Sequence, residues 1–254
     1  MIFDTHSHLF ESEFDSDRDE CFKRLKEIDG KVMLVGFNPH NNQIAYDLAK
    51  QYNMYSSAGL HPDEANGNVS DKLQSLKKFL ETHKVYAVGE CGLDYHYGTD
   101  DIDIQKYIFE EQIKLSIKYH LPLIIHSRDA QQDTFDMLSK YKGQCFGIMH
   151  CYSGSLEMAL EYIKLGFYIS LGGPVTFKNA KEPKRVAANI PLDKLLVETD
   201  CPFLAPEPFR GKRNESSYVK YSAEAIANIR GISYEELTEA TYKNSLRIFN
   251  IGKE

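Results

Sequence analysis

Short runs of apolar and β-branched residues recur along the chain, and longer amphipathic segments separate them. The short runs predict eight strands, at residues 2–6, 32–37, 54–60, 85–89, 121–125, 146–149, 167–171 and 195–198. The segments with helical spacing predict helices at residues 20–28, 42–51, 72–83, 105–119, 133–141, 156–165, 218–229 and 234–249. Strand and helix therefore alternate along the chain.

This alternation predicts a parallel sheet with helices packed against it. Eight strand–helix units in 254 residues match the size of a single-domain (β/α)8 TIM-type barrel, an α/β fold that we predict for residues 1–254. A doubly wound open sheet is the alternative. The sequence contains no linker, low-complexity tract or internal repeat that would divide it, and Gly231 is a predicted helix stop between the last two helices.

Composition narrows the class of protein. Hydrophobic residues make up 42% of the chain and charged residues 26%, as in a compact soluble protein. No apolar run approaches the roughly 20 residues that cross a bilayer, and no signal-peptide pattern opens the sequence. Five cysteines, an odd number, fit reduced thiols. We therefore predict a cytoplasmic protein that does not associate with membranes.

The net charge limits how the protein can bind nucleic acid. Its formal value is −7, which argues against a protein that coats nucleic acid through an overall basic surface. A nuclease stays compatible with this charge, because bound divalent cations and a few local arginines attract phosphate into a deep site.

Metal-binding side chains stand at the ends of the predicted strands, where enzymes on (β/α)8 barrels place their active sites. Residues i and i+2 of a strand project from the same face, so His6 and His8 are placed to bind one ion. An isolated pair of this kind is weak support, and the joint placement at several strand ends carries the prediction. The residues at these ends are His6, His8, His61, Glu90, His126, His150 and Asp200.

The donor types narrow the range of metals that the site is expected to bind. Imidazole and carboxylate ligands without thiolate suit Zn, Mn, Co or Ni, and Mg where the histidines contribute weakly. One catalytic zinc site uses three or four protein ligands, fewer than this chain offers. We therefore predict two divalent ions that share one carboxylate, with Glu90 between them. The predicted ligands are His6, His8, Glu90, His126, His150 and Asp200.

Seven stretches together resemble the TatD family of metal-dependent deoxyribonucleases, within the amidohydrolase-like metallohydrolases. They are DTHSHL, GLHP, VGECGLDY, PLIIHSRDA, HCYSG, VETDCPFLAP and RGKRNE, and they span essentially the whole chain. The resemblance implies that the reaction is hydrolysis of DNA phosphodiesters. It also implies one ion on His6, His8, Glu90 and Asp200 and a second on Glu90, His126 and His150.

Three residues form the predicted catalytic set. Glu90 is shared by the two ions, which lower the pKa of a bound water and neutralise charge on phosphate oxygens. Asp200 is the candidate general base, or a ligand only. His61 matches a family position at the mouth of the site and is the candidate to hold a phosphate oxygen, with a solvent-facing histidine as the alternative.

Further residues receive supporting roles. Arg213 and Asn214, in a basic and amide cluster after the last strand, are the predicted substrate-binding residues, because a guanidinium binds phosphate through two hydrogen bonds. Asp94 is predicted to orient a ligating imidazole and Tyr95 to stack on a base, with loop packing as the alternative for each. Arg128 and Asp129 are predicted to cap the helix that follows them.

Two functions are compatible with these residues. The first is a metal-dependent deoxyribonuclease that acts as an exonuclease on single-stranded or frayed DNA ends. The second is a hydrolase of amides or esters, or an aminoacyl-tRNA deacylase, because the same metal site activates water for either reaction. A nuclease needs an open groove lined by Arg213 and its neighbours, whereas a small-molecule hydrolase needs a closed apolar pocket. A metal-binding module without catalysis is disfavoured.

Overall fold

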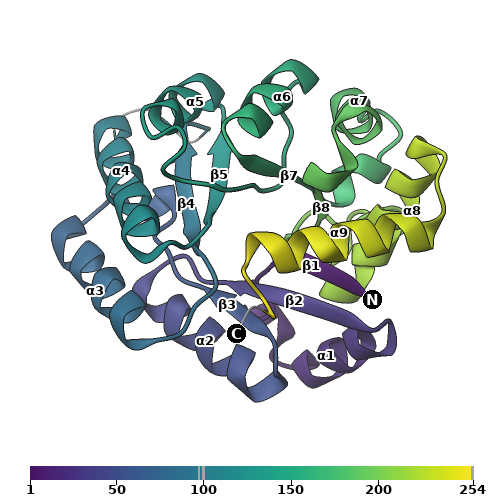
Figure 1. Cartoon of the computed structure of the whole chain (residues 1–254). Helices are drawn as coiled ribbons and strands as arrows, with labels where there is room; N and C mark the ends of the chain where they lie inside the picture. The colour runs from purple at the N-terminus through teal and green to yellow at the C-terminus, as the bar shows by residue number, and fades with distance from the viewer. Residues whose placement is uncertain (97, 99–100, 253–254) are drawn as a thin grey trace.

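Eight parallel strands form the centre of the protein, and helices surround them (Figure 1). The computed structural model describes residues 1–96, 98 and 101–252. All eight predicted strands are present, although several bounds differ from the predicted ones. The strands are β1 Ile2–Ser7, β2 Gly30–Val35, β3 Tyr55–Ser57, β4 Val88–Asp94, β5 Leu123–Arg128, β6 Gly147–Met149, β7 Phe167–Leu171 and β8 Leu195–Val197.

Helices connect the strands and cover their outer side. In the described part of the chain the α-helices are α1 Arg18–Glu27, α2 Pro39–Tyr52, α3 Val69–Thr82, α4 Ile102–Tyr119, α5 Gln131–Ser139, α6 Leu156–Lys164, α7 Lys181–Asn189, α8 Val219–Arg230 and α9 Tyr234–Ile248. The predicted helices do not include α7, which buries only Val186 and Ala187 and so lacks a long apolar stripe. Gly231 ends α8 with a left-handed φ of 67°, which confirms the predicted helix stop.

Two seams close the strands into a barrel. Regular parallel pairing runs from β1 to β3 and from β4 to β8. Single parallel bridges join Ser7 to Cys201 and Ala58 to Val88. Across the first seam the amide of Asp200 donates to the carbonyl of His6 over 2.9 Å. The strands therefore follow chain order around one barrel, and the predicted (β/α)8 fold is confirmed over the open-sheet alternative.

Apolar side chains fill the interior of the barrel at one end. Helix α9 crosses this end in Figure 1 and contacts both β1 and β8. Its residues Ile248 and the following Phe249 complete the packing, so a polar site can form only at the other end, where the strands finish. The interior residues are Phe3, Met33, Val35, Ala87, Ile124, Ile148, Tyr168, Leu196, Ile248 and Phe249.

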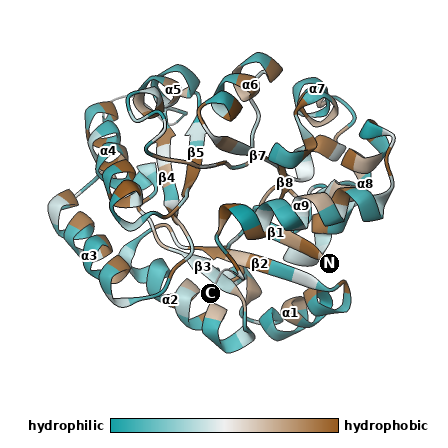
Figure 2. Ribbon diagram, in the orientation of Figure 1, coloured by the Kyte–Doolittle hydropathy of each residue, from teal (hydrophilic) through white to brown (hydrophobic). Residues whose placement is uncertain are grey.

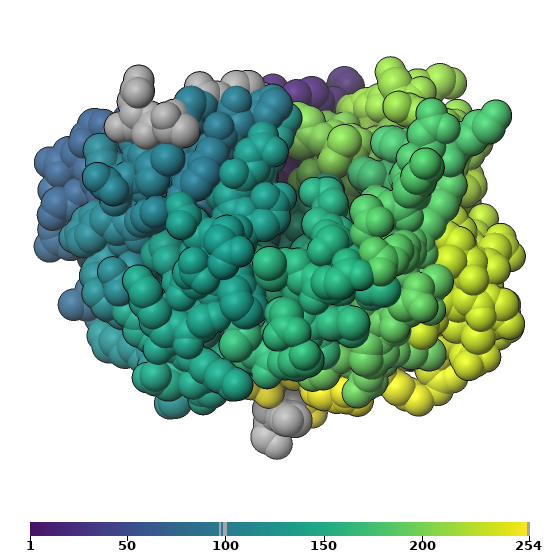
Figure 3. All heavy atoms as spheres, turned by 90° about the horizontal axis from the view of Figure 1, so that it is seen from above, coloured from purple at the N-terminus to yellow at the C-terminus, as the bar shows by residue number. Residues whose placement is uncertain are grey.

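A larger apolar layer lies between the strands and the outer helices. Leu76 of α3, Phe109 of α4, Tyr162 of α6 and Ile226 of α8 belong to it. The same helices carry hydrophilic residues on other sides (Figure 2). In Figure 3 the colours run in order across the molecule from blue through green to yellow, as expected for successive units around one axis. None of the helices in the described ranges has the length and apolar character to span a membrane.

Candidate metal centre

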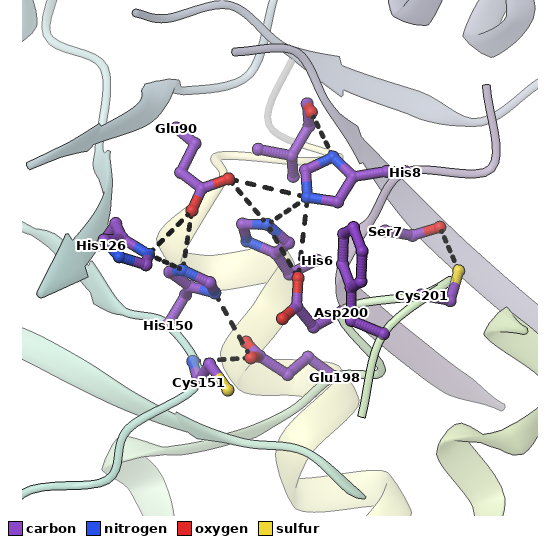
Figure 4. A network of polar contacts seen from close by, with 12 residues as sticks. His6, Ser7, His8, Glu90, His126, His150, Cys151, Glu198, Asp200 and Cys201 are labelled. Carbon is purple, nitrogen blue, oxygen red and sulfur yellow. Dashed lines mark hydrogen bonds and ion pairs between the residues drawn. The ribbon is translucent and has the colours of Figure 1, made fainter. Parts of the chain in front are cut away.

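Six side chains from five strands meet at the carboxyl end of the barrel (Figure 4). Strand β1 supplies His6, β4 and β5 supply one side chain each, and the segments that directly follow β1, β6 and β8 supply the other three. The structure thus brings together the residues that the sequence predicts as ligands. They are His6, His8, Glu90, His126, His150 and Asp200.

Ordinary strand alternation turns His126 and His150 into the barrel. Ile124 and Ile148, two residues earlier on their strands, pack in the barrel interior. Side chains two positions apart on a strand share a face, so the two histidines project above these isoleucines. The nitrogen atoms His126 Nδ1 and His150 Nε2 lie 3.3 Å apart.

A register shift in β1 turns His6 inward. Phe3 packs inside the barrel, so strict alternation would place Thr5 and Ser7 inside and His6 outside. The pairing of β1 with β2 shifts between Asp4 and Ser7. Irregularities of this kind re-aim side chains next to active sites. Because of the shift, the Nε2 atom of His6 lies in the centre of the site, fully buried.

A second register shift, in the pairing of β4 with β5, turns Glu90 inward. Val88 faces the outer helices, and strict alternation would turn Glu90 the same way. The pairing of β4 with β5 shifts between Val88 and Cys91. Gly89 permits the close approach of the strands at this point, since a Cβ on it would lie 2.6 Å from the carbonyl oxygen of Ile124. The Glu90 carboxylate consequently lies between the two groups of histidines.

Four donor atoms surround one point in the site. His6 Nε2 and His8 Nε2 lie 3.1 Å apart. Glu90 Oε2 lies 3.3 and 3.6 Å from them, and Asp200 Oδ1 lies 3.7 and 3.6 Å from them. Ligands about 2.1 Å from a tetrahedral ion lie about 3.4 Å from one another. The four atoms therefore have the spacing of a metal-binding set, which we call the first ligand set.

The other oxygen of Glu90 belongs to a second group of donors. Glu90 Oε1 lies 2.9 Å from His150 Nε2 and 3.2 Å from His126 Nδ1. His61 Nε2 lies 3.7 Å from the same oxygen, at the edge of the group. We call Glu90, His126 and His150 the second ligand set. Each set uses one oxygen of Glu90, an arrangement that fits two ions sharing this carboxylate.

Contacts behind the rings orient two of the imidazoles. His8 Nδ1 lies 2.9 Å from the carbonyl oxygen of Val35, and His126 Nε2 lies 3.0 Å from Asp94 Oδ2. Such partners fix which nitrogen carries the proton and which one faces a metal. Asp94 thus makes the contact that the sequence predicts for it. Tyr95 instead donates its hydroxyl to Asp133 over 2.8 Å and packs against the core, as in the loop-packing alternative.

The two carboxylates of the site are ionised. Burial raises the pKa of Glu90, but the positive charges of His150 and His6 outweigh burial and hold this pKa well below its usual value. For Asp200, burial acts in the same way and is outweighed by the hydrogen bond from His8, so its pKa is lowered. Burial lowers the pKa of His6. Contacts with neighbouring carboxylates outweigh burial and raise the pKa values of His8, His126 and His150. An ionised carboxylate binds a cation directly, and a metal that binds an imidazole displaces its proton, so the residues fit two divalent ions.

Both ligand sets open into a cavity of about 670 Å³. His61 lines this cavity, and its Nδ1 accepts a hydrogen bond from the amide of Asp63. Arg128, the last residue of β5, is the one lysine or arginine among the described residues that line it. The predicted helix-capping role of Arg128 and Asp129 is wrong, because the N-cap of α5 is Ala130, without a side-chain cap.

Arg213 and Asn214 are not among the described residues that line the cavity, and their contacts argue against the predicted role in substrate binding. The guanidinium of Arg213 donates to both carboxylate oxygens of Asp17 over 2.7 Å. Asn214 is fully buried and donates to the carbonyl oxygens of Thr199 and Phe203 over 2.8 and 2.7 Å. The groups that would bind phosphate are thus used within the protein, where they hold the segment after β8.

Sequence reasoning assigned no role to Glu198. Its carboxylate is fully buried beneath the site, where Oε1 accepts a hydrogen bond from the amide of Cys151 over 2.6 Å. The same oxygen lies 3.5 Å from His150 Nδ1, on the side of the ring away from Glu90 (Figure 4). A charged residue two positions after Leu196, at the end of the apolar run LLV, is the signal that points to it.

Comparisons with known proteins agree with this geometry. A family model described as TatD related DNase matches residues 3–250. The uncharacterized metal-dependent hydrolase YabD of Bacillus subtilis is 46% identical over 255 residues, which cover 99% of this chain and 100% of YabD. The corresponding hydrolase YcfH of Escherichia coli K12 is 36% identical, over 99% of this chain and 96% of its own.

A solved structure gives the same result. The crystal structure of YJJV, a TatD homologue from Escherichia coli K12, matches with a TM-score of 0.92 and 30% sequence identity. The match covers 98% of each chain. The chain therefore belongs to the TatD family of metal-dependent hydrolases.

Proposed function

We propose that the protein hydrolyses phosphodiester bonds of DNA and acts as an exonuclease on single-stranded or frayed ends. The observation that carries this proposal is the joining of two ligand sets through Glu90 inside one cavity. Paired divalent ions supply an activated water and neutralise charge on phosphate oxygens, which is the chemistry that a phosphodiester requires. The description of the matching family, TatD related DNase, supports the same substrate.

Asp200 is the proposed general base. Its carboxylate stands in the first ligand set and lines the cavity, so it faces both the ions and the substrate. The lowered pKa of Asp200 keeps the carboxylate ionised, as the acceptor of a proton from the attacking water must be. No covalent intermediate with the protein is needed in this reaction.

His61 is proposed to hold a phosphate oxygen. His61 Nδ1 is directed to Asp63, with the amide nitrogen at 3.2 Å and the carboxylate oxygen Oδ2 at 3.3 Å, so Nε2 faces the site. This nitrogen lies 3.7 Å from Glu90 Oε1, beside the second ligand set. His61 Nε2 is thus next to the position where an ion would hold the scissile phosphate.

Arg128 takes the place of Arg213 as the proposed cationic contact to phosphate. It is the one lysine or arginine among the described residues that line the cavity. An arginine donates two parallel hydrogen bonds to a phosphate group, which gives orientation as well as charge.

The test is hydrolysis of an end-labelled single-stranded oligonucleotide by metal-stripped protein, restored separately with Mg, Mn and Zn. We expect stepwise shortening, and we expect Glu90→Ala to abolish it because both ligand sets lose an oxygen. Glu64→Gln is the matched control, since Glu64 also lines the cavity but pairs with Lys72 and belongs to neither set. Absence of cleavage with every ion, despite bound metal, would contradict the proposal.

A second candidate is the hydrolysis of amides or esters, including deacylation of aminoacyl-tRNA. The position of Arg213 outside the cavity favours it, as do the apolar lining residues Leu171, Pro174 and Val175. The same metal-restored protein is to be assayed with a p-nitrophenyl ester and with an aminoacyl-tRNA. Turnover of either substrate without DNA cleavage would favour this candidate over the nuclease.

A further inference from the structure

Two large apolar side chains remain exposed at the cavity. Phe203 is 55% exposed and Leu204 is 43% exposed, and both line the cavity that holds the ligand sets. Adjacent apolar side chains that stay exposed and are bordered by polar residues are typical of ligand-binding grooves. These residues are not part of the metal-binding machinery.

Hydrogen bonds on both sides of Phe203 fix its backbone and keep the residue at the cavity. Its amide donates to the carbonyl oxygen of Asp200 over 2.9 Å. Its carbonyl oxygen accepts a hydrogen bond from the buried side chain of Asn214 over 2.7 Å. The peptide groups on both sides of the residue are therefore fixed, which holds the Phe203 side chain at the cavity.

The backbone of Leu204, next to Phe203, adopts an energetically unfavourable conformation. Its φ of 53° lies in the left-handed region, which a branched side chain seldom adopts. Its carbonyl oxygen packs on Gly173, where a Cβ would come within 2.0 Å of it. Conformations of this kind persist where the surrounding structure imposes them, and they gather at functional sites.

The ring of Phe203 is close to the first ligand set. Its centroid lies 6.5 Å from that of His8, in an edge-on arrangement. The ring of Phe37, which also lines the cavity, lies 5.4 Å from His8. A phosphate held between the two ligand sets carries its nucleobase only one sugar away. A base attached to that phosphate therefore comes within reach of an aromatic face.

We propose that Phe203, supported by Leu204, stacks on the nucleobase beside the scissile phosphate and so determines the preference for an unpaired terminal nucleotide. This inference rests on the proposed function. In a duplex the neighbouring bases cover both faces of each base, so an unpaired base at an end presents a free face to the ring. Stacking on an aromatic side chain accepts any of the four bases, because each has a π face.

The experiment compares two single-stranded substrates of equal length, an oligothymidylate and an oligonucleotide built from abasic residues. Wild-type protein, Phe203→Ala, Phe203→Leu and Phe203→Trp are assayed on both with the same metal. Tyr107→Ala is the matched control, since Tyr107 is an exposed aromatic residue on α4 and does not line the cavity. Thermal unfolding and bound-metal analysis check that each variant is folded and loaded.

We expect Phe203→Ala to lower kcat/KM on oligothymidylate by about 5- to 100-fold, chiefly through KM. On the abasic substrate we expect little change, because the stacking partner is absent there. Phe203→Trp should retain the activity on oligothymidylate and Phe203→Leu should not, which separates stacking from simple burial of apolar surface. Tyr107→Ala should behave as wild type on both substrates.

Three other outcomes would overturn the inference. Equal losses on both substrates would mean that Phe203 supports the segment around Asp200 and does not contact a base. Unchanged kinetics on oligothymidylate would exclude the stacking role while the proposed function stands. Cleavage of neither substrate by wild-type protein with bound metal would remove the proposed function and this inference with it.

Discussion

Asp94 Oδ2 lies 3.0 Å from His126 Nε2, and the other nitrogen of the same ring lies 3.2 Å from Glu90 Oε1. The carboxylate of Asp94 therefore holds the ring from behind while Nδ1 faces the second ligand set. Burial alone would raise the pKa of Asp94, but the hydrogen bond from His126 contributes to an overall lowering, so the carboxylate is ionised. A charged partner of this kind makes the imidazole a stronger ligand.

Asp94→Asn tests this contact. An amide has almost the same shape but lacks the charge, so we expect the affinity of the second ligand set for metal to fall about 10- to 100-fold. The first ligand set is the internal control, because Asp94 contacts none of its members in the described structure. Competition with a chelator during zinc titration measures both affinities. An equal loss at both sites, or no loss, would contradict the role of Asp94.

Asp200→Asn tests the proposed general base. The amide keeps a ligand oxygen but does not accept a proton at neutral pH, so we expect the rate of DNA hydrolysis to fall by about 100-fold or more. Metal analysis by mass spectrometry should still find two ions per chain. A rate close to that of wild type with both ions retained would leave Asp200 as a ligand only.

Arg213→Gln separates a structural role from a role in substrate binding. Because the guanidinium binds Asp17 through two hydrogen bonds of 2.7 Å, we expect the free energy of unfolding to fall by about 1–2 kcal/mol. We expect KM for DNA to stay unchanged. Chemical denaturation and steady-state kinetics give the two values. A raised KM with unchanged stability would restore the role in phosphate binding that the sequence suggests, and Arg128→Gln, which should raise KM, serves as the comparison.

The pH dependence of stability reports the same ion pair. The hydrogen bond from Arg213, with Arg24 nearby, lowers the pKa of Asp17 to about 2. A pKa that is lower in the folded state stabilises the protein above the pKa of the unfolded chain, about 3.9, and this stabilisation is lost as pH falls through about 2. We expect metal-free Asp17→Asn to be about 1 kcal/mol less stable than metal-free wild type at pH 7.

This difference between the two proteins should shrink as the pH falls from about 4 to about 2, where Asp17 of the wild type takes up its proton. Denaturant unfolding at a series of pH values measures it, and taking the difference cancels groups that titrate alike in both proteins. A difference that is constant from pH 7 down to about pH 2 would show that the charge of Asp17 contributes nothing.

Periodicity was sufficient to predict the barrel, and part of the site follows from the same rule. His126 and His150 face inward because Ile124 and Ile148 do, which strand alternation alone predicts. His6 and Glu90 are different, since each reaches the site only through a register shift against a neighbouring strand. Pairing irregularities depend on contacts between strands, so the pattern along one strand does not reveal them.

The basic cluster shows a second limit of sequence reasoning. A short run with Arg213 at its centre has the composition of a phosphate-binding loop. Its partner Asp17 is 196 positions away in the sequence, and only the closed barrel brings the two together. Whether a guanidinium meets a substrate or a carboxylate of its own chain depends on such distant contacts.

The first ligand set spans the seam between β1 and β8. His6 lies on the first strand of the chain and His8 directly follows it, whereas Asp200 follows the last strand. The two ends meet through the bridge between Ser7 and Cys201. An ion held by these ligands would therefore connect the first strand of the barrel to the segment after the last strand. Loading of that ion and closure of the barrel become one coupled equilibrium, so removing metal should loosen the terminal strands before the central ones.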